Sequence, residues 1–426
     1  MNGNSTRRFR AKRELILDIA ARHFNQHGIR GGTLAEVARV VGLATNSLTY
    51  YYPKKEDLAS ACLLRSIESV STLCAQAVQQ PRVADRVREF VGGYVKMLTD
   101  IGLGKHPEMA VFNEVRSLTP PHSDTVGAAY TDMFRKVRAL LRPLPDELGT
   151  GGGREVDRQA LNARPHLLLS LTTWTRAWFQ RYELQDYEQA GERMADIIIN
   201  GLAAPGVRWD SQATVMPWLA SPVSGSTQDA FLRAATREVN DHGYRGASVD
   251  RISAQLHLTK GAFYHHHETK HELISACFER TFQAMRTIQA AAAGSPGTGW
   301  QRLQRACCGL VAYQLSEHGP LLRVSAWSAL PEAMRHGMQR TMTRVGERFG
   351  ALIVDGMADG SLRICDQSIA AQLVNGMINA AAEIEHWVPG LTPDNAARLF
   401  VAPMLCGLAP PVNAVSGAVA RMGMRG

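Results

Sequence analysis

The 426-residue sequence lacks the patterns that mark several large classes of protein. Its seven cysteines are scattered without a Cys-x-x-Cys pair, which argues against a disulfide framework or a structural zinc site and fits a reducing compartment. No apolar run approaches the roughly 18 residues of a transmembrane helix. The basic N-terminus is not followed by the apolar core of a secretory signal. We therefore expect a cytoplasmic protein that does not enter the membrane.

The motifs of common enzyme classes are also missing. The sequence contains no phosphate-binding glycine loop before a helix, no nucleophile elbow and no His-Glu-x-x-His zinc motif. The glycine run Gly151–Gly153 has no Lys-Ser after it and is interpreted as a loop. The pattern indicates a protein that is not an enzyme and needs no cofactor or metal.

What is present is an ordinary globular composition with a basic excess. Hydrophobic residues make up 45% and charged residues 20%, which is enough to bury a core and excludes bulk disorder. The length is typical of two or three domains. Lys and Arg exceed Asp and Glu by 47 to 39, giving a net charge of +8, which permits an anionic partner without proving one.

The chain contains two copies of one pattern. A shift of 215 residues places Gly28 over Gly243 and needs no gap from Leu17 to Leu58. Identical pairs in this register include Leu17/Leu232, Ala20/Ala235, His27/His242, Gly28/Gly243, Arg30/Arg245, Gly31/Gly246, Leu43/Leu258, Lys55/Lys270 and Leu58/Leu273. So many identities in one ungapped register indicate an internal duplication.

The ends of the copies repeat as well. Gly201-Leu202-Ala203 matches Gly407-Leu408-Ala409 at a shift of 206, so the second copy is about nine residues shorter inside, with Gly151–Gly153 a candidate for the extra loop. The stretch 204–226 is rich in small residues and proline and predicts a linker, and 409–426 predicts a loose tail.

Each copy begins with the pattern of three short helices. Ile16, Ala20 and Phe24 share one helical face, and Gly28 is placed to end that helix. Thr33 with Glu36 predicts a capping box at the start of a second helix, which Gly42 ends. A third helix begins at Ala44 or Thr45 after a turn of three or four residues. This is the helix-turn-helix arrangement, with two generic helical hairpins as the plainer alternative.

The third helix favours the DNA-binding interpretation. Polar and aromatic side chains surround the inward Leu48 in the first copy and the inward Phe263 in the second. Such donors can reach phosphates and base edges from a helix in the major groove.

These segments resemble a known family. The strings TLAEVARVVGLATNSLTYYYPKKEDL (33–58) and SVDRISAQLHLTKGAFYHHHETKHEL (248–273) resemble the DNA-binding domain of the TetR family of bacterial regulators, the second more closely. The resemblance implies an all-α fold with two tandem TetR-like units, each a three-helix DNA-binding domain followed by a helical ligand-binding and dimerisation core. The expected boundaries are 1–58 and 59–203 for the first unit, 204–226 for the linker, 227–273 and 274–408 for the second unit, and 409–426 for the tail.

The resemblance also assigns DNA-contacting positions. In the first copy they are Thr33, Thr45, Asn46, Ser47, Thr49, Tyr50, Tyr51 and Lys55. In the second copy they are Ser248, Lys260, Gly261, Ala262, Tyr264, His265, His266 and Lys270. The first copy departs from the family's usual Lys, Gly and Tyr at Thr45, Asn46 and Thr49, where Tyr50 and Tyr51 are candidate substitutes.

The two copies differ in charge. Residues 1–58 contain ten Lys or Arg and five Asp or Glu, a net charge of +5, whereas residues 226–273 contain six of each, a net charge of 0. The excess comes chiefly from Arg7, Arg8, Arg10, Lys12 and Arg13. This arm is expected either to lie along DNA or to be a solvated, disordered tail.

The remaining part of each copy has an amphipathic helical pattern. By resemblance, pairing helices are expected at 166–182 and 187–201 in the first copy and at 368–388 and 393–407 in the second. The simplest architecture is an intramolecular pseudo-dimer, and the rival is a homodimer of chains. Joining the copies raises the effective concentration of each for the other.

A ligand pocket is expected by resemblance in each core. The candidate lining residues are Met109, Phe112, Tyr130, Phe134, Trp174 and Trp178 in the first copy, and Tyr313, Trp327, Met334, His386 and Trp387 in the second. Plain core packing is the competing interpretation for each of them. Because neither sequence segment shows converging charges, we expect a small, apolar or amphipathic effector.

The sequence thus predicts a DNA-binding transcriptional regulator, a repressor by the habit of the family, whose partners are double-stranded DNA and a small molecule. Two alternatives stay open. One is an architectural DNA binder without an effector. The other is a regulator whose second helix-turn-helix serves protein interaction only.

The third helices of the two copies carry different side chains, which predicts an operator whose two halves differ in sequence. Asn46 faces Gly261 in the alignment and Tyr50 faces His265, and different donors read different bases. Footprinting should show a site without a strict inverted repeat under one chain, and a clean palindrome would contradict this prediction.

Overall fold

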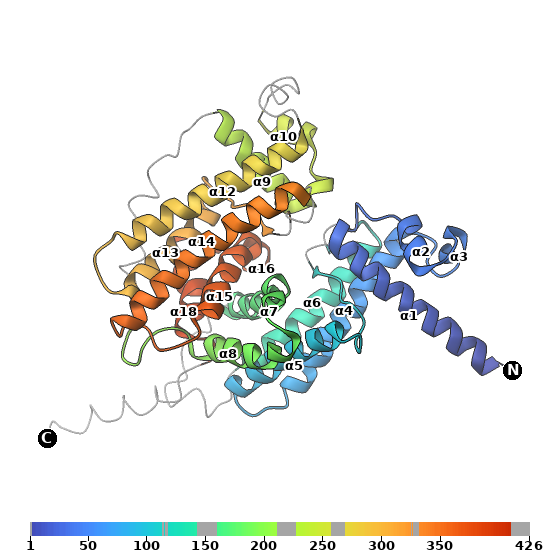
Figure 1. Cartoon of the computed structure of the whole chain (residues 1–426), viewed down its shortest axis with the longest axis horizontal. Coiled ribbons are helices and arrows are strands. Elements are labelled where there is room, and N and C mark those ends of the chain that lie inside the picture. Colours follow the sequence, from blue (N-terminus) through green and yellow to red (C-terminus); the bar gives the residue numbers. More distant parts are fainter. Residues whose placement is uncertain are drawn as a thin grey trace.

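The structure is a computed structural model that describes residues 2–112, 115, 118–142, 160–210, 227–256, 269–324, 326 and 332–409. All regular elements within these ranges are helices, apart from an isolated β-bridge between Ala203 and Leu362. The predicted all-α fold is therefore confirmed. Figure 1 shows two helical units, with helices of both meeting at the centre of the molecule.

The first unit opens with a three-helix group, here called the first head. It comprises α1 (Asn2–His27), α2 (Leu34–Val41) and α3 (Thr45–Thr49). Thr33 and Glu36 form the predicted capping box, and Gly28 and Gly42 end α1 and α2 with positive φ angles of 71° and 73°. Leu48 anchors α3 in the core with no exposed surface. The predicted start of this unit is confirmed helix by helix.

The N-terminal arm is not the disordered tail of one expectation, and the other expectation, that it lies along DNA, stays a prediction. Residues 2–13 continue α1 as one helix of 26 residues, so the arm is neither an extended strand of chain nor a separate tail. In Figure 1 this part of α1 projects beyond the rest of the first head. The sequence 2–13 contains no proline and only one glycine, so nothing in it stops the helix from continuing.

The remaining helices of the first unit form its core. They are α4 (Lys55–Ala77), α5 (Val83–Gly102), α6 (His122–Leu140), α7 (Ala160–Trp178) and α8 (Tyr187–Asn200), with short 3-10 turns at Phe179–Arg181 and Leu184–Asp186. The expected domain boundary at 58/59 falls within the first turn of α4, which therefore belongs to both the head and the core.

Among the helices that the structure describes, α4 comes near the composition of a membrane span. By length and composition alone, Lys55–Ala77 is apolar enough to cross a membrane. More than half of its apolar stretch is buried, because α4 packs against α1, α5 and α6. We attribute its apolar character to its place at the centre of the first unit.

The second unit repeats this order. Its head contains α9 (Thr227–Gly246, kinked at Gly243) and α10 (Val249–Gln255), and α12 (Lys270–Ala293) takes the place of α4. The core continues with α13 (Gly299–Leu315), α14 (Glu332–Ala358) and α15 (Gln367–Ala380). It closes with a 3-10 turn at Ala381–Glu383, α16 (Ile384–Trp387), α17 (Pro393–Ala396), a π-helical turn at Ala397–Val401 and α18 (Ala402–Cys406).

The two units meet through the helices at the end of each. Helix α7 packs against α15, and α8 also contacts α15, so that one continuous hydrophobic core includes residues of both units (Figure 1). His166 of α7 is buried and its Nε2 lies 3.1 Å from the carbonyl oxygen of Ala380. These are the helices that the sequence assigns to pairing.

The chain crosses itself where α8 and α18 end. The amide of Ala203 donates to the carbonyl of Leu405, and the amide of Ala409 donates to the carbonyl of Ile199, at 3.3 Å in both cases. Under the shift of 206 these two hydrogen bonds are equivalent, so the crossing has a local two-fold symmetry. Gly201 and Gly407 lie at its centre, where the backbones approach too closely for a side chain.

The start of the predicted linker is part of the folded body. The indole Nε1 of Trp300 donates to the carbonyl of Arg208 at 3.3 Å, and the ring of Trp209 lies edge-on to Trp300 with a centroid distance of 6.5 Å. Residues 204–210 therefore dock on α13 and do not act as linker. The small residues predicted a loop, but Trp209 supplies an apolar anchor. Residues 211–226, the loop at Gly151–Gly153 and the tail from 410 lie outside the described residues.

Replacing Gly201 by Ala is expected to weaken folding by about 3 kcal/mol, since a Cβ there would lie 2.4 Å from the backbone carbon of Cys406 and the φ angle is 71°. Gly206→Ala is the matched control, because Gly206 also has positive φ but open space around it. The control should lose about 1 kcal/mol. Urea unfolding measures the free energy of unfolding of both variants. Equal losses would show that the close approach at the crossing contributes nothing to stability.

Candidate DNA interface and ligand cavities

The first head presents a polar surface on α3. Thr45, Asn46 and Ser47 are exposed, and Tyr50 just after the helix has 76% of its surface exposed. Thr49 is half-buried and its hydroxyl donates to the carbonyl of Asn46 at 2.9 Å. The hydroxyl of Thr33 is engaged with Glu36 at the start of α2. The side chains that sequence analysis selected on α3 are thus accessible around the buried Leu48.

The extension of α1 adds a basic, aromatic edge to this surface. Phe9 stacks on Tyr51 with ring centroids 4.9 Å apart and meets Tyr50 edge-on. Arg13 donates from Nε to the hydroxyl of Tyr52 at 2.9 Å. These contacts hold the exposed cations Arg7, Arg8 and Arg10 beside the end of α3.

The two lysines among the expected DNA contacts donate to the protein's own backbone in this structure. The Lys55 Nζ donates to the carbonyl of Arg30 at 3.3 Å, and the Lys270 Nζ donates to the carbonyl of Ala247 at 2.7 Å. Desolvation is the main cause that lowers the pKa of Lys270, which is half-buried. In this structure both lysines stabilise the turn before the second helix of their head.

The second head is described only in part. Ser248 caps α10 by accepting from the amide of Arg251, and its own amide donates to the buried carboxylate of Glu238 at 3.2 Å. Arg251 also binds Glu238, which fixes α10 on α9. The predicted contacts Lys260, Gly261, Ala262, Tyr264, His265 and His266 lie outside the described residues.

A loop of the first core is fastened to the first head by polar side chains. Asn25 of α1 donates to the carbonyl of Met109 at 2.8 Å and accepts from the amide of Val111 at 3.0 Å. Arg65 of α4 donates to the carbonyl of Glu108, and Ser66 accepts from the amide of Ala110, both at 2.8 Å. We call residues 108–111 the first loop.

The second unit repeats this fastening with equivalent residues. Asn240 donates to the carbonyl of Leu321 at 2.9 Å and accepts from the amide of Arg323 at 3.0 Å. Arg280 donates to the carbonyl of Pro320, and Thr281 accepts from the amide of Leu322 at 2.8 Å. Residues 320–323 are here called the second loop. In both units a movement of the loop is therefore coupled mechanically to the head.

The first loop borders a cavity of about 590 Å³, here called the first cavity. Its wall combines residues of the first unit with residues of the second, including Arg323, Asn379, Glu383 and Trp387. Arg176 of α7 lines it and forms an ion pair with Glu108 at 2.5 Å. Arg323 pairs with Glu383 across the same space. The volume lies within the range of about 300–1,000 Å³ that is typical of small-molecule sites.

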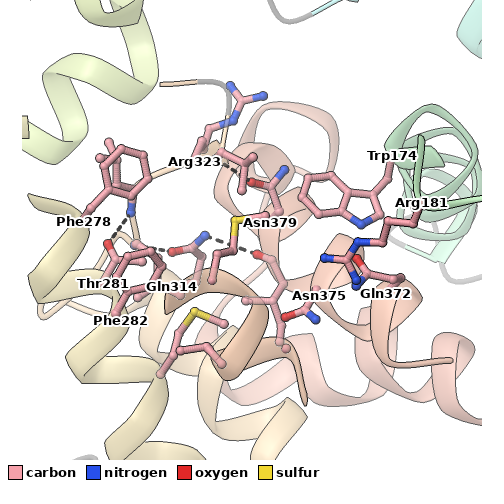
Figure 2. A pocket seen from close by; sticks show the side chains of 18 residues that line it. Trp174, Arg181, Phe278, Thr281, Phe282, Gln314, Arg323, Gln372, Asn375 and Asn379 are labelled. Carbon is pink, nitrogen blue, oxygen red and sulfur yellow. Dashed lines mark hydrogen bonds between the residues drawn. The ribbon is translucent and has the colours of Figure 1, made fainter. Parts of the chain in front are cut away.

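The second loop borders a much smaller space of about 60 Å³, the second cavity (Figure 2). Phe278, Phe282 and Thr281 of α12 lie on one side, and Trp174 and Arg181 of the first unit on the other. Gln314 donates to the carbonyl of Ile378 and accepts from the amide of Leu321, so its side chain bridges the second loop and α15.

The effector residues that sequence analysis selected are only partly brought together. Met109, Phe112, Tyr130, Trp174 and Trp387 line the first cavity, and Trp387 comes from the second unit. Phe134 stacks on Trp387 behind this wall, with centroids 4.9 Å apart. Trp178 is buried against Phe179, and Tyr313 lies near Arg280, outside both linings. Trp327 and the side chains of Met334 and His386 lie outside the described residues.

The expectation that no charges converge is wrong. Arg176, Arg323 and Glu383 all face the first cavity. These residues are far apart in sequence and come from both units, so neither copy taken alone could reveal that they meet.

Comparison with family models gives a match at both heads. The model of bacterial regulatory proteins of the tetR family matches residues 16–62 and again 231–277. A second model, the tetracyclin repressor-like C-terminal domain, matches residues 296–387. The chain belongs to the TetR family. It carries two TetR-like units in tandem and is a DNA-binding transcriptional regulator.

Individual relatives match parts of the chain. The transposon Tn10 TetC protein of Escherichia coli is 23% identical over 157 residues, which is 35% of this chain and 76% of TetC. The HTH-type transcriptional regulator RutR of Escherichia coli K12 is 35% identical over 66 residues, so this chain spans only 31% of the length of RutR.

Solved structures of TetR regulators each cover less than half of the chain. PfmR from Thermus thermophilus is 20% identical over 43% of this chain and 95% of its own, with a TM-score of 0.32. AibR, solved in complex with isovaleryl coenzyme A and operator DNA, is 19% identical over 44% of this chain and 97% of its own, with a TM-score of 0.34.

The residues that fasten the loops to the TetR heads were missed by sequence analysis. Asn25 and Asn240 are identical under the shift of 215, as are Arg65 and Arg280. A polar identity inside a duplicated helix is the signal that could have found them. A polar side chain that faces only solvent is readily replaced. Its retention in two diverged copies therefore indicates a hydrogen bond within the protein.

The helical extension predicts a measurable electrostatic contribution. Replacing both Arg7 and Arg8 by Gln should reduce the slope of log affinity against log salt by up to about 2, since each phosphate contact contributes about 0.9. Fluorescence anisotropy with a labelled random-sequence duplex measures the slope. Arg22→Gln, an exposed position of α1 beside Asp18, is the control. Equal slopes for the native protein, the double variant and Arg22→Gln would show that the extension does not contact DNA.

Proposed function

We propose that the chain is a repressor that reads one operator with both heads, as an intramolecular pseudo-dimer, and that a small effector releases it. Such a regulator would act in the cytoplasm, where the DNA lies. The observation that carries the proposal is the crossing of α8 and α18, whose two equivalent backbone hydrogen bonds join the units about a local two-fold axis.

Side-chain contacts between the units support this pairing. Arg193 of the first unit pairs with Asp366 at 2.9 Å, and Arg363 of the second unit pairs with Asp196 at 2.7 Å. Partly exposed ion pairs add little stability but fix register. Most of the stabilisation comes from the shared hydrophobic core, which contains buried residues from Ile16 to Leu408. These contacts support a pairing of the two units within one chain.

Both heads are expected to read DNA, each with its own bases. In the first head the exposed Thr45, Asn46 and Ser47 are the candidates for base contacts, with Tyr50, Tyr51 and the basic extension positioned for the backbone. In the second head the candidates are the residues of segment 260–266. Because the two sets differ, the operator proposed here is asymmetric.

The first cavity supports an effector in preference to a purely architectural role. The loop that borders the cavity is hydrogen-bonded to the head, so a bound molecule that moves the loop would also move the head. Allosteric release requires that the effector bind one head position more tightly than the other. An architectural binder has no use for such a cavity.

One observation favours the second alternative, in which the second head serves protein interaction. That head has no net charge, and its Lys270 is engaged by the backbone of Ala247. The double variant Lys260→Ala with Tyr264→Phe separates the two functions. We expect it to weaken operator binding by about 10- to 100-fold, because a phosphate and a groove contact are lost.

Gel shifts on DNA flanking the gene measure this affinity, and light scattering measures the mass of the complex. The result expected is one chain per operator in the native protein. Asn46→Ala, a change on the third helix of the first head, is the positive control. If the double variant binds as tightly as the native protein while Asn46→Ala does not, the second head is not a DNA reader. Two chains per operator would contradict the pseudo-dimer.

A further inference from the structure

The two cavities occupy equivalent places in the two units. Under the shift of 206, His166, Leu169 and Thr173 of α7 correspond to Gln372, Asn375 and Asn379 of α15, and these residues line the first and second cavity respectively. Each cavity is also closed by residues of the opposite unit. The pair is therefore one ancestral site present twice, with volumes of about 590 and 60 Å³.

Substitutions at equivalent positions account for the difference in volume. The second unit has Phe278 and Phe282 of α12 where the first has Leu63 and Ile67 of α4. From the opposite unit, the second cavity receives the indole of Trp174, whereas the equivalent residue at the first cavity is Ala380 (Figure 2). The second cavity is filled by its own side chains.

We infer that each chain binds one effector molecule, in the first cavity alone, and that this single molecule acts on both heads. The inference rests on the proposed function and deepens it. A homodimer with one pocket per unit would bind two molecules, whereas here one cavity has kept the volume of a ligand site and the other has become part of the core.

The wall of the first cavity selects the chemistry of the ligand. Phe112, Tyr130 and Trp387 form one aromatic side, with Phe112 edge-on to Tyr130 at 5.5 Å and Tyr130 5.0 Å from Trp387. The guanidinium groups of Arg176 and Arg323 line the same space, and each is ion-paired with a carboxylate, Arg176 with Glu108 and Arg323 with Glu383. Aromatic faces favour a flat ring, and guanidinium groups match a carboxylate. The ligand class is a planar aromatic compound with one anionic group, which competes with Glu108 or Glu383 for a guanidinium group.

One molecule in this cavity reaches both heads. Asn25 belongs to the first head, lines the cavity and holds the first loop. Arg323 lines the cavity from the second unit, and its amide is held by Asn240 of the second head. A ligand that displaces these two residues shifts two heads at once, without a second binding event.

Dye titration tests the site without DNA, so its outcome is independent of the proposed repression. The probe is 1-anilinonaphthalene-8-sulfonate, a planar aromatic anion, and N-phenyl-1-naphthylamine supplies the uncharged counterpart. Fluorescence and calorimetry should show one sulfonate dye per chain, bound at least about tenfold more tightly than the amine. Two equivalent dye sites per chain would overturn the single-site inference, and equal affinities would overturn the anionic ligand class.

A cavity-filling variant locates the dye. Gly127→Met places a long side chain on the α6 wall of the first cavity, and no atom lies within 4 Å of the Cβ it introduces. It should weaken dye binding at least about tenfold. Gly92→Met, which is exposed on α5 and also has open space, is the matched control and should bind normally. Ala177→Met fills the same cavity from α7 and serves if the first variant misfolds. Unchanged binding in a folded cavity variant would overturn the location.

Hydrogen exchange tests the action on both heads. With the dye bound, peptides that contain the end of α1 and the end of α9 should both change their exchange, since Asn25 and Asn240 lie in them. A change confined to the first unit would show that the single molecule acts on one head only.

Discussion

The arrangement of the whole chain depends on a backbone crossing at which two glycines face one another. Gly201 and Gly407 let the ends of α8 and α18 approach until each amide finds a carbonyl of the other unit. A side chain at either position would collide with the backbone of the other unit. The shared core, the composite wall of the first cavity and the relative position of the two heads all follow from this approach.

The duplicated fastening of loop to head shows which features the two units have retained. Asn25 and Asn240, like Arg65 and Arg280, make the same contacts in units whose cavities differ about tenfold in volume. The connection between a loop and its head has thus been kept in both units, while the space beside the loop has been kept in one. The loop-to-head hydrogen bonds, which would transmit a movement, are therefore distinct from the cavity, which would bind the effector.

The sequence predicted the repeated parts well because they depend on local signals. Helix periodicity, the Thr33–Glu36 box and the positive φ of Gly28 and Gly42 are each set by a few neighbouring residues. The docking of Trp209 on Trp300 and the meeting of Arg176 with Arg323 could not be predicted, because both depend on contacts between units that no local pattern encodes. The helical state of residues 2–13 was missed for another reason: a run of cations suggested a free arm, and helix propagation from α1 was left out of account.

The difference between Leu63 and Phe278 at one repeated position has a genetic consequence. In a dimer of identical subunits one codon specifies the residue at both symmetry-related positions, so a change that closes one site closes its mate as well. Fusion of the two halves into one reading frame gives every position a second, independent codon. Either half can then change or lose its ligand site while the other half keeps it.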